Sequence, residues 1–170
     1  MKNMHKDTGD VERYTADYII NAVRDFNGGF IDLDPASCLE ANKSIGAETI
    51  FTKEDDALTK DWFGHIWMNH PFSRQNNPIW TDYAYQQWRN NPEVLSLINI
   101  SFSSTSSDWW QLHADRSKAI CYPKKRSCYK KKPTDKSGAM KDSSIFYFGN
   151  QPERFKKVFQ EIHNIGVVKF

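Results

Sequence analysis

The sequence predicts an α/β fold in one compact domain, with a central, mostly parallel sheet and helices on both of its faces. Apolar segments of strand length alternate along the chain with segments of helical spacing, which is the pattern of such folds. The chain has 170 residues, of which 39% are hydrophobic and 26% are charged, and this is enough for one ordinary core. Because no internal repeat occurs, we expect residues 1–170 to form a single domain, in which the polar residues 1–10 are disordered.

In the first half of the chain, each expected element has a local signal. The segment "TADYIINAVRDF" has apolar residues at helical spacing, with Thr15 as the expected N-cap and Gly28 and Gly29 as the end of the helix. Short strands are expected within "GFIDLDPAS", "ETIF" and "HIWMN". The segment "CLEANKSIG" predicts a short helix that Gly46 ends.

The second half continues the alternation. Helical spacing over residues 79–89 is followed by "EVLSLINIS", the strongest candidate for a buried strand, and by a short helix in "TSSDWWQLHAD". Two further strands are expected at "AICYP" and "SSIFYFG", and an edge strand at "GVVKF". The last helix, "PERFKKVFQEI", places four apolar side chains on one face: Phe155, Val158, Phe159 and Ile162.

Three of the expected strands run into polar motifs, "DLDPAS", "KEDDAL" and "NHPF". In open α/β sheets, ligands bind outside the carboxyl ends of the strands. We therefore expect the three motifs to lie on one rim and to form a binding site. Taken singly, each also suits a simple structural role, because Asn, Asp and Pro favour turns and acidic residues cap helices.

The motif "NHPF" suits the recognition of a flipped adenine. The side-chain oxygen of Asn69 and the backbone carbonyl of His70 can accept the two hydrogens of an exocyclic amino group, which helps transfer of a methyl group to that nitrogen. Pro71 fixes the local backbone, and the ring of Phe72 offers a face for stacking, worth about 1–3 kcal/mol per base. Flipping is required because the amino group cannot be reached inside a duplex.

The acidic motifs suit a cofactor that carries hydroxyl and ammonium groups. Asp32 and Asp34 follow the first expected strand, where a carboxylate could bind ribose hydroxyls or the ammonium of a methionine-like cofactor. One carboxylate of Glu54, Asp55 and Asp56 could accept from the amino group of the cofactor's adenine.

The ordered motifs "YTADYII", "DLDPAS", "KEDDAL", "WMNHPFS", "SSTSSDWW" and "YPKKRSCY" resemble the phage-type DNA adenine-N6 methyltransferase (Dam-like) family, from about residue 14 to about residue 149. The resemblance implies a Rossmann-like, S-adenosylmethionine-dependent enzyme that methylates the N6 amino group of adenine at specific sites in DNA. The family signature Asn-Pro-Pro-Tyr or Asn-Pro-Pro-Phe matches Asn69, Pro71 and Phe72. Cofactor-binding roles follow for Thr15, Asp32, Asp34, Pro35, Asp55 and Asp56.

His70 departs from the family signature, which has proline at this position. The carbonyl that would accept a hydrogen bond is retained, but one of two consecutive φ constraints is lost. The histidine could contact the substrate, alter specificity, weaken the site or lie in a surface turn. Two alternatives to DNA methylation therefore stay open: a nucleic-acid-binding protein that kept the fold without catalysis, and a methyltransferase that acts on RNA.

A basic loop is expected over residues 124–142, between two strands. Blocks of like charge are often only solvated, but a basic loop beside a base-modifying site is an expected phosphate contact. Together with the residues that follow the "NHPF" motif, the expected DNA contacts are Ser73, Arg74, Lys124, Lys125, Arg126, Lys130, Lys131 and Lys132, and the loop also contains Lys136. The net charge of +2 offers no support from the whole molecule.

Composition limits the other classes. The three cysteines form no CxxC pair, and neither a disulfide framework nor a metal site is expected. Neither an apolar signal segment nor a run of eighteen apolar residues occurs, so we expect a cytoplasmic protein, in the host cytoplasm if a phage encodes it.

Overall fold

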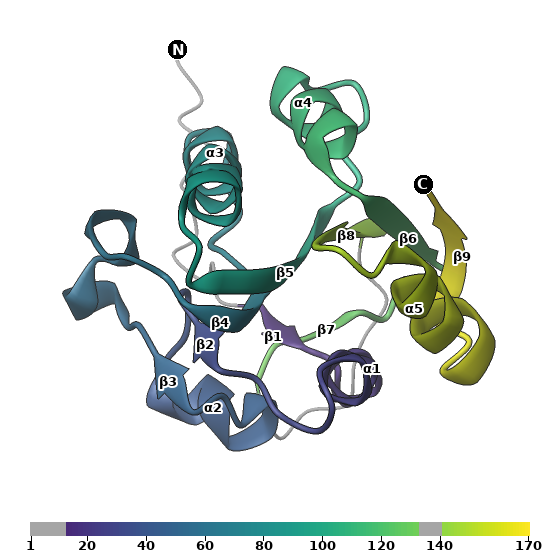
Figure 1. The fold of residues 1–170 in the computed structure, drawn as a ribbon, viewed down its shortest axis with the longest axis horizontal. Helices are drawn as coiled ribbons and strands as arrows, with labels where there is room; N and C mark the ends of the chain where they lie inside the picture. The colour runs from purple at the N-terminus through teal and green to yellow at the C-terminus, as the bar shows by residue number, and fades with distance from the viewer. Residues whose placement is uncertain (1–12, 133–140) are drawn as a thin grey trace, which may run out of the picture.

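The computed structural model describes residues 13–132 and 141–170, which form a sheet between two layers of helices (Figure 1). The order of the seven strands in the sheet is β3-β2-β4-β5-β8-β6-β9. The strands of this sheet are β2 (Leu33–Asp34), β3 (Thr49–Ile50), β4 (Gly64–Met68), β5 (Val94–Phe102), β6 (Ala119–Pro123), β8 (Ser143–Phe148) and β9 (Gly166–Lys169). The prediction of an α/β fold is confirmed.

The sheet is mixed, with a parallel half and an antiparallel half. Strand β2 pairs in parallel with β3 and β4, and β4 pairs in parallel with β5. Strand β8 is antiparallel to both of its neighbours, β5 and β6, and β9 is antiparallel to β6. Thus β2 to β6 all run in one direction, as expected of a mostly parallel sheet, but the insertion of β8 and the edge position of β9 make half of the pairings antiparallel.

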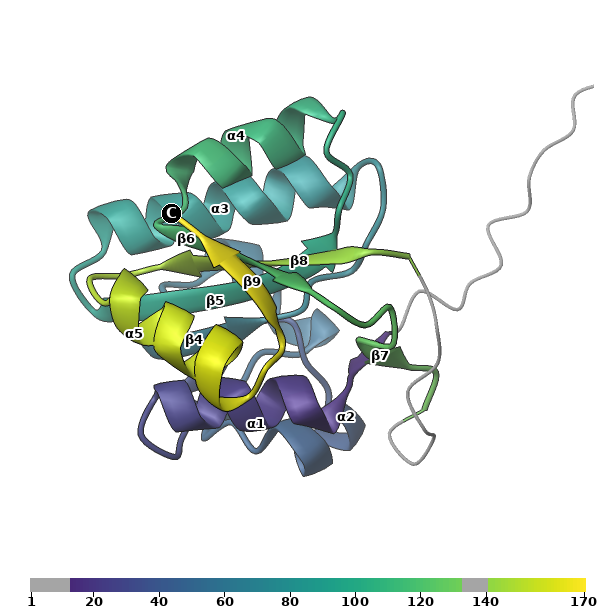
Figure 2. The same ribbon diagram turned by 90° about the vertical axis from the view of Figure 1, so that its right-hand side faces the viewer.

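Helices cover both faces of the sheet, as predicted. One face carries α3 and α4, and the other carries α1, α2 and α5 (Figure 2). The helices are α1 (Asp17–Phe26), α2 (Leu39–Ile45), α3 (Asn76–Asn90), α4 (Asp108–Arg116) and α5 (Pro152–Lys156), with 3₁₀ turns η1 (Lys53–Asp55) and η2 (Ala57–Thr59) after β3.

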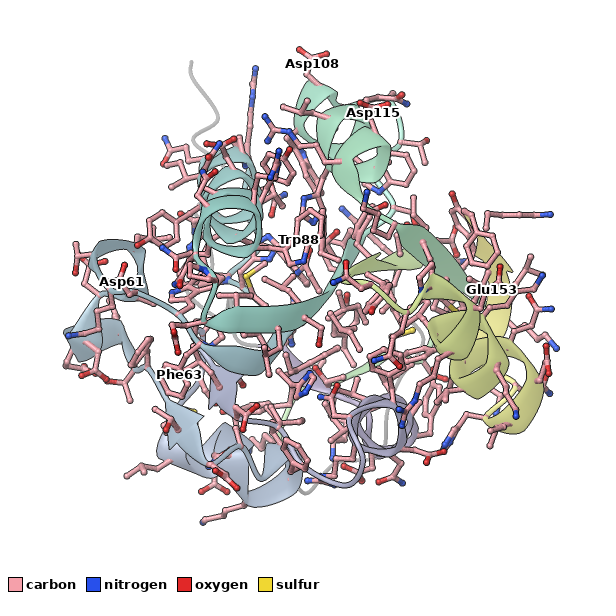
Figure 3. All side chains as sticks on the ribbon, viewed as in Figure 1. Asp61, Phe63, Trp88, Asp108, Asp115 and Glu153 are labelled. Atoms are coloured by element: carbon pink, nitrogen blue, oxygen red, sulfur yellow. The ribbon has the colours of Figure 1, made fainter. Side chains whose placement is uncertain are left out.

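The alternation of side chains along each strand gives the sheet two separate apolar cores. On β4, Trp67 faces the core beneath α1 and α5, whereas Ile66 and Met68 face the core beneath α3 and α4. Trp88 of α3 lies between its helix and the sheet, where its ring is 5.7 Å from that of Phe148 (Figure 3).

Helix α1 begins at Asp17, one residue later than an N-cap at Thr15 would give. Its N-cap is Ala16, without a side-chain capping bond, so the prediction of Thr15 as the N-cap is wrong. The end of the helix is as predicted, because Gly28 and Gly29 take positive φ values of 82° and 109°. Thr15 instead lies in β1 (Tyr14–Thr15), which pairs antiparallel with β7 (Tyr129–Lys130) in a two-stranded ribbon.

The last helix changes its winding. After α5, the chain continues as the π-helical segment η3 (Lys157–Ile162), in which the amide of His163 donates to the carbonyl of Val158. Phe155, Val158 and Phe159 are buried as predicted, but Ile162 is 56% exposed. The wider turn rotates Ile162 away from the face that an α-helical period predicts.

Two predictions apply in part to residues that the structure does not describe. Residues 1–10, expected to be disordered, lie outside the described residues, as does Lys136 in the basic loop. Among residues 13–132 and 141–170, no helix has the length and apolar character needed to cross a bilayer.

Candidate active site

The candidate site lies at the edge of the sheet where the parallel strands end. Strand β2 ends at Asp34, β3 ends at Ile50 just before the acidic loop, and β4 ends at Met68 directly before Asn69. Because β2 pairs in parallel with both β3 and β4, the three polar motifs leave the sheet at the same edge. The prediction of one shared rim is confirmed.

Asn69 is held by its amide nitrogen. This nitrogen donates to the backbone carbonyl of Arg13 at 2.6 Å and to Oγ1 of Thr15 at 3.0 Å. A carbonyl can only accept, so the NH₂ group must face Arg13 and the side-chain oxygen must point elsewhere. In the part of the chain that the structure describes, Oδ1 of Asn69 has no hydrogen-bond partner, and it is the atom expected to accept from an adenine amino group.

Thr15 reaches the site through Asn69 rather than as a helix cap. It is 3% exposed, and its neighbour across the ribbon is Tyr129. The β1–β7 ribbon lies beyond the N-terminus of α1, at one end of the sheet (Figure 2). It therefore brings two segments more than a hundred residues apart to the same edge as Asn69.

Asp34 is a buried carboxylate. It is 1% exposed, and Oδ1 accepts from the amide of Ala36 at 3.1 Å across the buried Pro35. Among the described residues, no cationic side chain pairs with it. Burial raises the pKa of Asp34 from 3.8 to about 7. A buried carboxylate without a cation is costly, and this favours a positively charged ligand beside it.

Asp32 lies away from Asn69, although it is only two residues from Asp34. One carboxylate oxygen accepts from the backbone amide of His65 at 2.6 Å, at the start of β4. His65 precedes Asn69 by four residues, about 13 Å along a strand. Leu33 pairs with Ile66, so Asp34 lies level with Trp67, which is about 7 Å along the strand from Asn69. Asp32 is therefore occupied in joining β2 to β4 and lies further than Asp34 from the end of β4 that carries Asn69.

The acidic loop follows β3 at the rim, but its first carboxylate has a local structural role. Oδ2 of Asp55 accepts from both the amide and the hydroxyl of Thr52, at 2.8 and 2.9 Å, in a capping box. These two bonds lower the pKa of Asp55. Asp56 is exposed and has a left-handed backbone with φ of 50°. Both residues remain at the correct edge for the proposed cofactor role.

His70 is buried, and the interpretation of it as a surface turn histidine is wrong. It is 2% exposed, and its ring stacks on Trp80 with 6.3 Å between ring centroids. Nε2 lies 3.0 Å from Oδ1 of Asn77, and Nδ1 lies 3.3 Å from Nδ2 of Asn99. Burial lowers the pKa of His70 to about 4. Its side chain points to the α3 face, so only its backbone remains available for a substrate at the Asn69 side.

Pro71 is exposed, and Phe72 is half-buried in an aromatic cluster. The ring of Phe72 lies 4.6 Å from that of Phe102 at the end of β5 and 5.7 Å from that of Tyr129 in β7. Phe72 therefore packs against one ring from the main sheet and one from the ribbon.

The first part of the basic loop begins where β6 ends, at the same edge as Asn69. Its three cations are exposed but already have neighbours: Nζ of Lys124 donates to Oδ1 of Asn164, Lys125 lies over the ring of Tyr18, and Arg126 pairs with Asp142 at 3.1 Å. Such contacts are at the surface and can exchange for phosphate at low cost.

The second part of the loop corrects one predicted DNA contact. Lys130 is 4% exposed, and its Nζ donates to Oδ1 of Asp17 at 2.9 Å, so it holds β7 against α1. Lys131 and Lys132 are exposed. Near the other end of the rim, Arg74 is exposed, whereas Oγ of Ser73 accepts from the amide of Asn76 at the start of α3.

The sequence prediction missed two residues, Asn99 and His113. Asn99 lies in the middle of β5 and is 0% exposed, and its Oδ1 is 3.0 Å from Nε2 of His113, which is 1% exposed. The signal was present: an asparagine inside the apolar run "LINIS" is a buried polar group that needs partners.

A hollow of about 400 Å³ lies between α1 and α2. It is lined by polar and charged side chains, including Asp17, Arg24 and Lys130, but not by Asn69 or Asp34. Within the described ranges, no cluster of three or more His, Cys, Asp or Glu residues could hold a metal ion.

Comparison with known proteins gives one match. The family model described as DNA N-6-adenine-methyltransferase (Dam) matches residues 2–153. Comparisons with curated proteins and with solved structures found no match.

Proposed function

The chain belongs to the DNA N-6-adenine-methyltransferase family and is an adenine-N6 DNA methyltransferase, and from this premise we propose that S-adenosylmethionine is its methyl donor and that Asn69, His70, Pro71 and Phe72 bind the target adenine. We also propose that the enzyme methylates adenine at specific sites in DNA.

One observation carries the proposal. On neighbouring parallel strands, Asn69 has a side-chain oxygen without a partner among the described residues, and Asp34 is a buried carboxylate without a cation among them. S-adenosylmethionine carries a sulfonium and an ammonium group, and either positive charge would compensate Asp34. Asp34, the adjacent Pro35 and Thr15, which accepts from Asn69, suit the cofactor side of the site. Asp55 and Asp56 suit the adenosine part, whereas Asp32 fits a structural role better.

The residues at the rim act by positioning. Oδ1 of Asn69 and the carbonyl of His70 each accept one N–H of the adenine amino group, which frees the lone pair of that nitrogen from the ring. S-adenosylmethionine supplies an electrophilic methyl group on a positively charged sulfur. The transfer would leave the cofactor as a neutral thioether that keeps the electron pair of the carbon–sulfur bond, and the methylated amino group would lose one proton to water.

The target base must leave the duplex to reach this edge. Phe72 stacks on the flipped adenine, and its contacts with Phe102 and Tyr129 hold its ring in place. Pro71 limits the freedom of the turn between the two groups. The exposed cations at the same edge, Arg74, Lys124, Lys125, Arg126, Lys131 and Lys132, bind phosphates on either side of the base.

The test is transfer of a tritiated methyl group from S-adenosylmethionine into DNA, with the product identified as N6-methyladenine. We expect Asn69→Ala to lower kcat by about 10²–10³-fold, the usual loss for one hydrogen-bonding group that stabilises a transition state. Asn90→Ala, an exposed asparagine in the last turn of α3, is the matched control and should retain full activity.

Equal transfer by wild type and Asn69→Ala would reject the assigned role of Asn69. Transfer to RNA in preference to DNA, measured in the same assay, would reject the proposed substrate.

A further inference from the structure

A chain of buried polar side chains connects α4 with the turn that carries Asn69. It runs from His113 in α4 through Asn99 in β5 to His70 and then to Asn77 in α3. The first three of these side chains are at most 2% exposed. Buried polar groups are costly, and a chain of them on the apolar α3–α4 side of the sheet requires a reason.

Asn99 contacts the residues on both sides of Asn69 in the chain. Its Nδ2 lies 3.1 Å from the backbone carbonyl of Met68, the residue before Asn69, and 3.3 Å from Nδ1 of His70, the residue after it. One carboxamide on the neighbouring strand therefore holds the backbone before Asn69 and the side chain after it.

The donors and acceptors allow one direction only. Because Nδ2 of Asn99 donates to the carbonyl of Met68, its Oδ1 must accept from Nε2 of His113. Nδ2 of Asn99 also lies 3.1 Å from the backbone carbonyl of Ile100, so its two hydrogens are shared among three acceptors. Because an amide nitrogen cannot accept, Nδ1 of His70 carries no proton, and the proton on Nε2 is donated to Asn77. The buried ring of His70 is thereby fixed as a neutral tautomer and clamped between two hydrogen bonds and the ring of Trp80.

We propose that Asn99 and His113 are positioning residues for the methyl-transfer site: through His70 and the carbonyl of Met68, they hold the turn that presents Asn69, and they replace the backbone constraint that a proline at position 70 would give. This inference rests on the proposed function. It also explains why a histidine can stand in this turn, since a buried ring with hydrogen bonds at both nitrogens limits the movement of the backbone that carries it, although it does not fix φ covalently as proline does.

A purely structural role predicts a different outcome. Buried polar networks can often be replaced by apolar side chains of similar volume without loss of the fold. If the network served only stability, the substitution Asn99→Leu would change the melting temperature and leave the kinetic constants as they are. If it positions Asn69, kcat must fall even in a well-folded variant.

The first experiment separates these outcomes. For Asn99→Leu we expect kcat to fall by about 10–100-fold, because small displacements of a reacting group cost about this much. The affinity for S-adenosylmethionine, measured by calorimetry, should stay within about twofold, because Asp34 lies on the other face. His113→Phe retains a ring between Phe146 and Phe148 and should give a smaller loss in the same direction.

The matched control is Ser96→Ala. Ser96 is also buried in β5 and bonded to a histidine, His65, at 2.8 Å, but it lies at the opposite end of the strand. It should lower the melting temperature without lowering kcat.

The decisive experiment is rescue by proline. In the His70→Pro background, the backbone no longer depends on the ring of residue 70, and Asn99 acts only through the carbonyl of Met68. Adding Asn99→Leu should then lower kcat by less than about threefold, the part that the bond to Met68 contributes. An equal loss in the wild-type and His70→Pro backgrounds would overturn the proposal, as would an Asn99→Leu variant with unchanged kcat.

Amide hydrogen exchange gives a readout that does not require activity. The peptide covering residues 69–73 should exchange faster in Asn99→Leu than in wild type and should recover protection in the double variant, whereas β6 should not change. If wild type transfers no methyl group, the proposed function fails and the exchange pattern still decides whether Asn99 holds the turn. Unchanged exchange at residues 69–73 would reject the proposal that Asn99 holds this turn.

Discussion

The two sides of the strand-end rim treat their buried polar groups in opposite ways. On the α3–α4 side, His70 and Asn99 find hydrogen-bond partners within the protein, and among the buried side-chain atoms of the described residues, Nδ1 of His113 and Nε1 of Trp110 lack one. On the α1 side, Asp34 is buried without a cation and Oδ1 of Asn69 has no partner within the described ranges. The first side is nearly complete as folded, whereas the second requires a ligand to complete it. We infer that the α3–α4 side positions the turn that carries Asn69 and that the α1 side binds the cofactor.

Among the substitutions that test this difference between the two sides, the largest effect is expected for Asp34. Asp34→Asn should weaken S-adenosylmethionine binding by about 100-fold, because one member of a buried charge pair is lost. The same substitution should raise the melting temperature of the free protein by a few degrees, since an uncompensated buried carboxylate is removed. Calorimetric titration and thermal unfolding measure the two effects.

A substitution that weakens cofactor binding but stabilises the free protein indicates a residue that is retained for binding. A variant that loses stability and keeps its affinity would place Asp34 with the structural groups, and the distinction between the two sides would fail.

The second prediction compares how the buried groups of the two sides change the free energy of unfolding as the pH falls. His70 and His113 have folded pKa values of about 4 and 3, below the ordinary 6.5, so between about pH 6.5 and 4 the unfolded chain binds about two more protons at these sites and stability falls on acidification. Asp34 has the opposite sign, because its folded pKa of about 7 lies above 3.8 and the folded state holds the extra proton. Together these three groups should cost about 1.4 kcal/mol of stability per pH unit in wild type, and the two histidines alone about twice that in Asp34→Asn. Groups such as Asp55 contribute equally to both proteins and cancel in the comparison.

Urea unfolding of both proteins at pH 6.5, 5.5 and 4.5 measures this difference. Parallel curves for wild type and Asp34→Asn would mean that Asp34 does not retain its proton in the folded protein.

The same two sides explain how far the sequence predicts the molecule. The helices and strands of the main sheet follow from local periodicity and caps, and the shared rim follows from the alternation of strands and helices. The ribbon of β1 and β7 was missed because neither of its segments has an apolar run of its own, and only the contact between distant segments creates it. It is this ribbon that moves Thr15 from a helix cap to a partner of Asn69.

The site was predicted in position but not in detail. Asp32 and Asp34 are equivalent in the sequence, and the structure separates them because the backbone of β4 takes up one carboxylate. A surface turn was one of the alternatives for the side chain of His70, and Lys130 was expected to contact DNA, but both side chains are buried beside partners far along the chain, Asn99 and Asp17. Such pairings depend on tertiary packing, which periodicity and spacing do not encode.

The third prediction concerns the exposed cations at the rim. Lys131→Gln should weaken DNA binding by a few-fold at moderate salt and reduce the slope of log K against log[salt] by about 0.9, the change expected for one lost phosphate contact. Lys169→Gln is the control, because β9 runs opposite to β6 and ends at the far edge of the sheet. Fluorescence anisotropy over a series of salt concentrations measures both variants, and an equal effect of the two would remove the rim from the DNA interface.

The smallest functional effect is expected at Asp32, the carboxylate that most resembles Asp34 in the sequence. Asp32→Asn retains an oxygen that can accept from the amide of His65, so the affinity for S-adenosylmethionine and the rate of methyl transfer should stay within about twofold of wild type. Its effect should appear in stability, because the carboxylate joins β2 to the start of β4 beside Gly64, where a Cβ atom would clash with Oδ2 of Asp32. Calorimetry and thermal unfolding of this variant, alongside Asp34→Asn, give the comparison. A loss of affinity as large as that of Asp34→Asn would show that the cofactor reaches past Asp34 along β2, and the binding side would then extend beyond the rim.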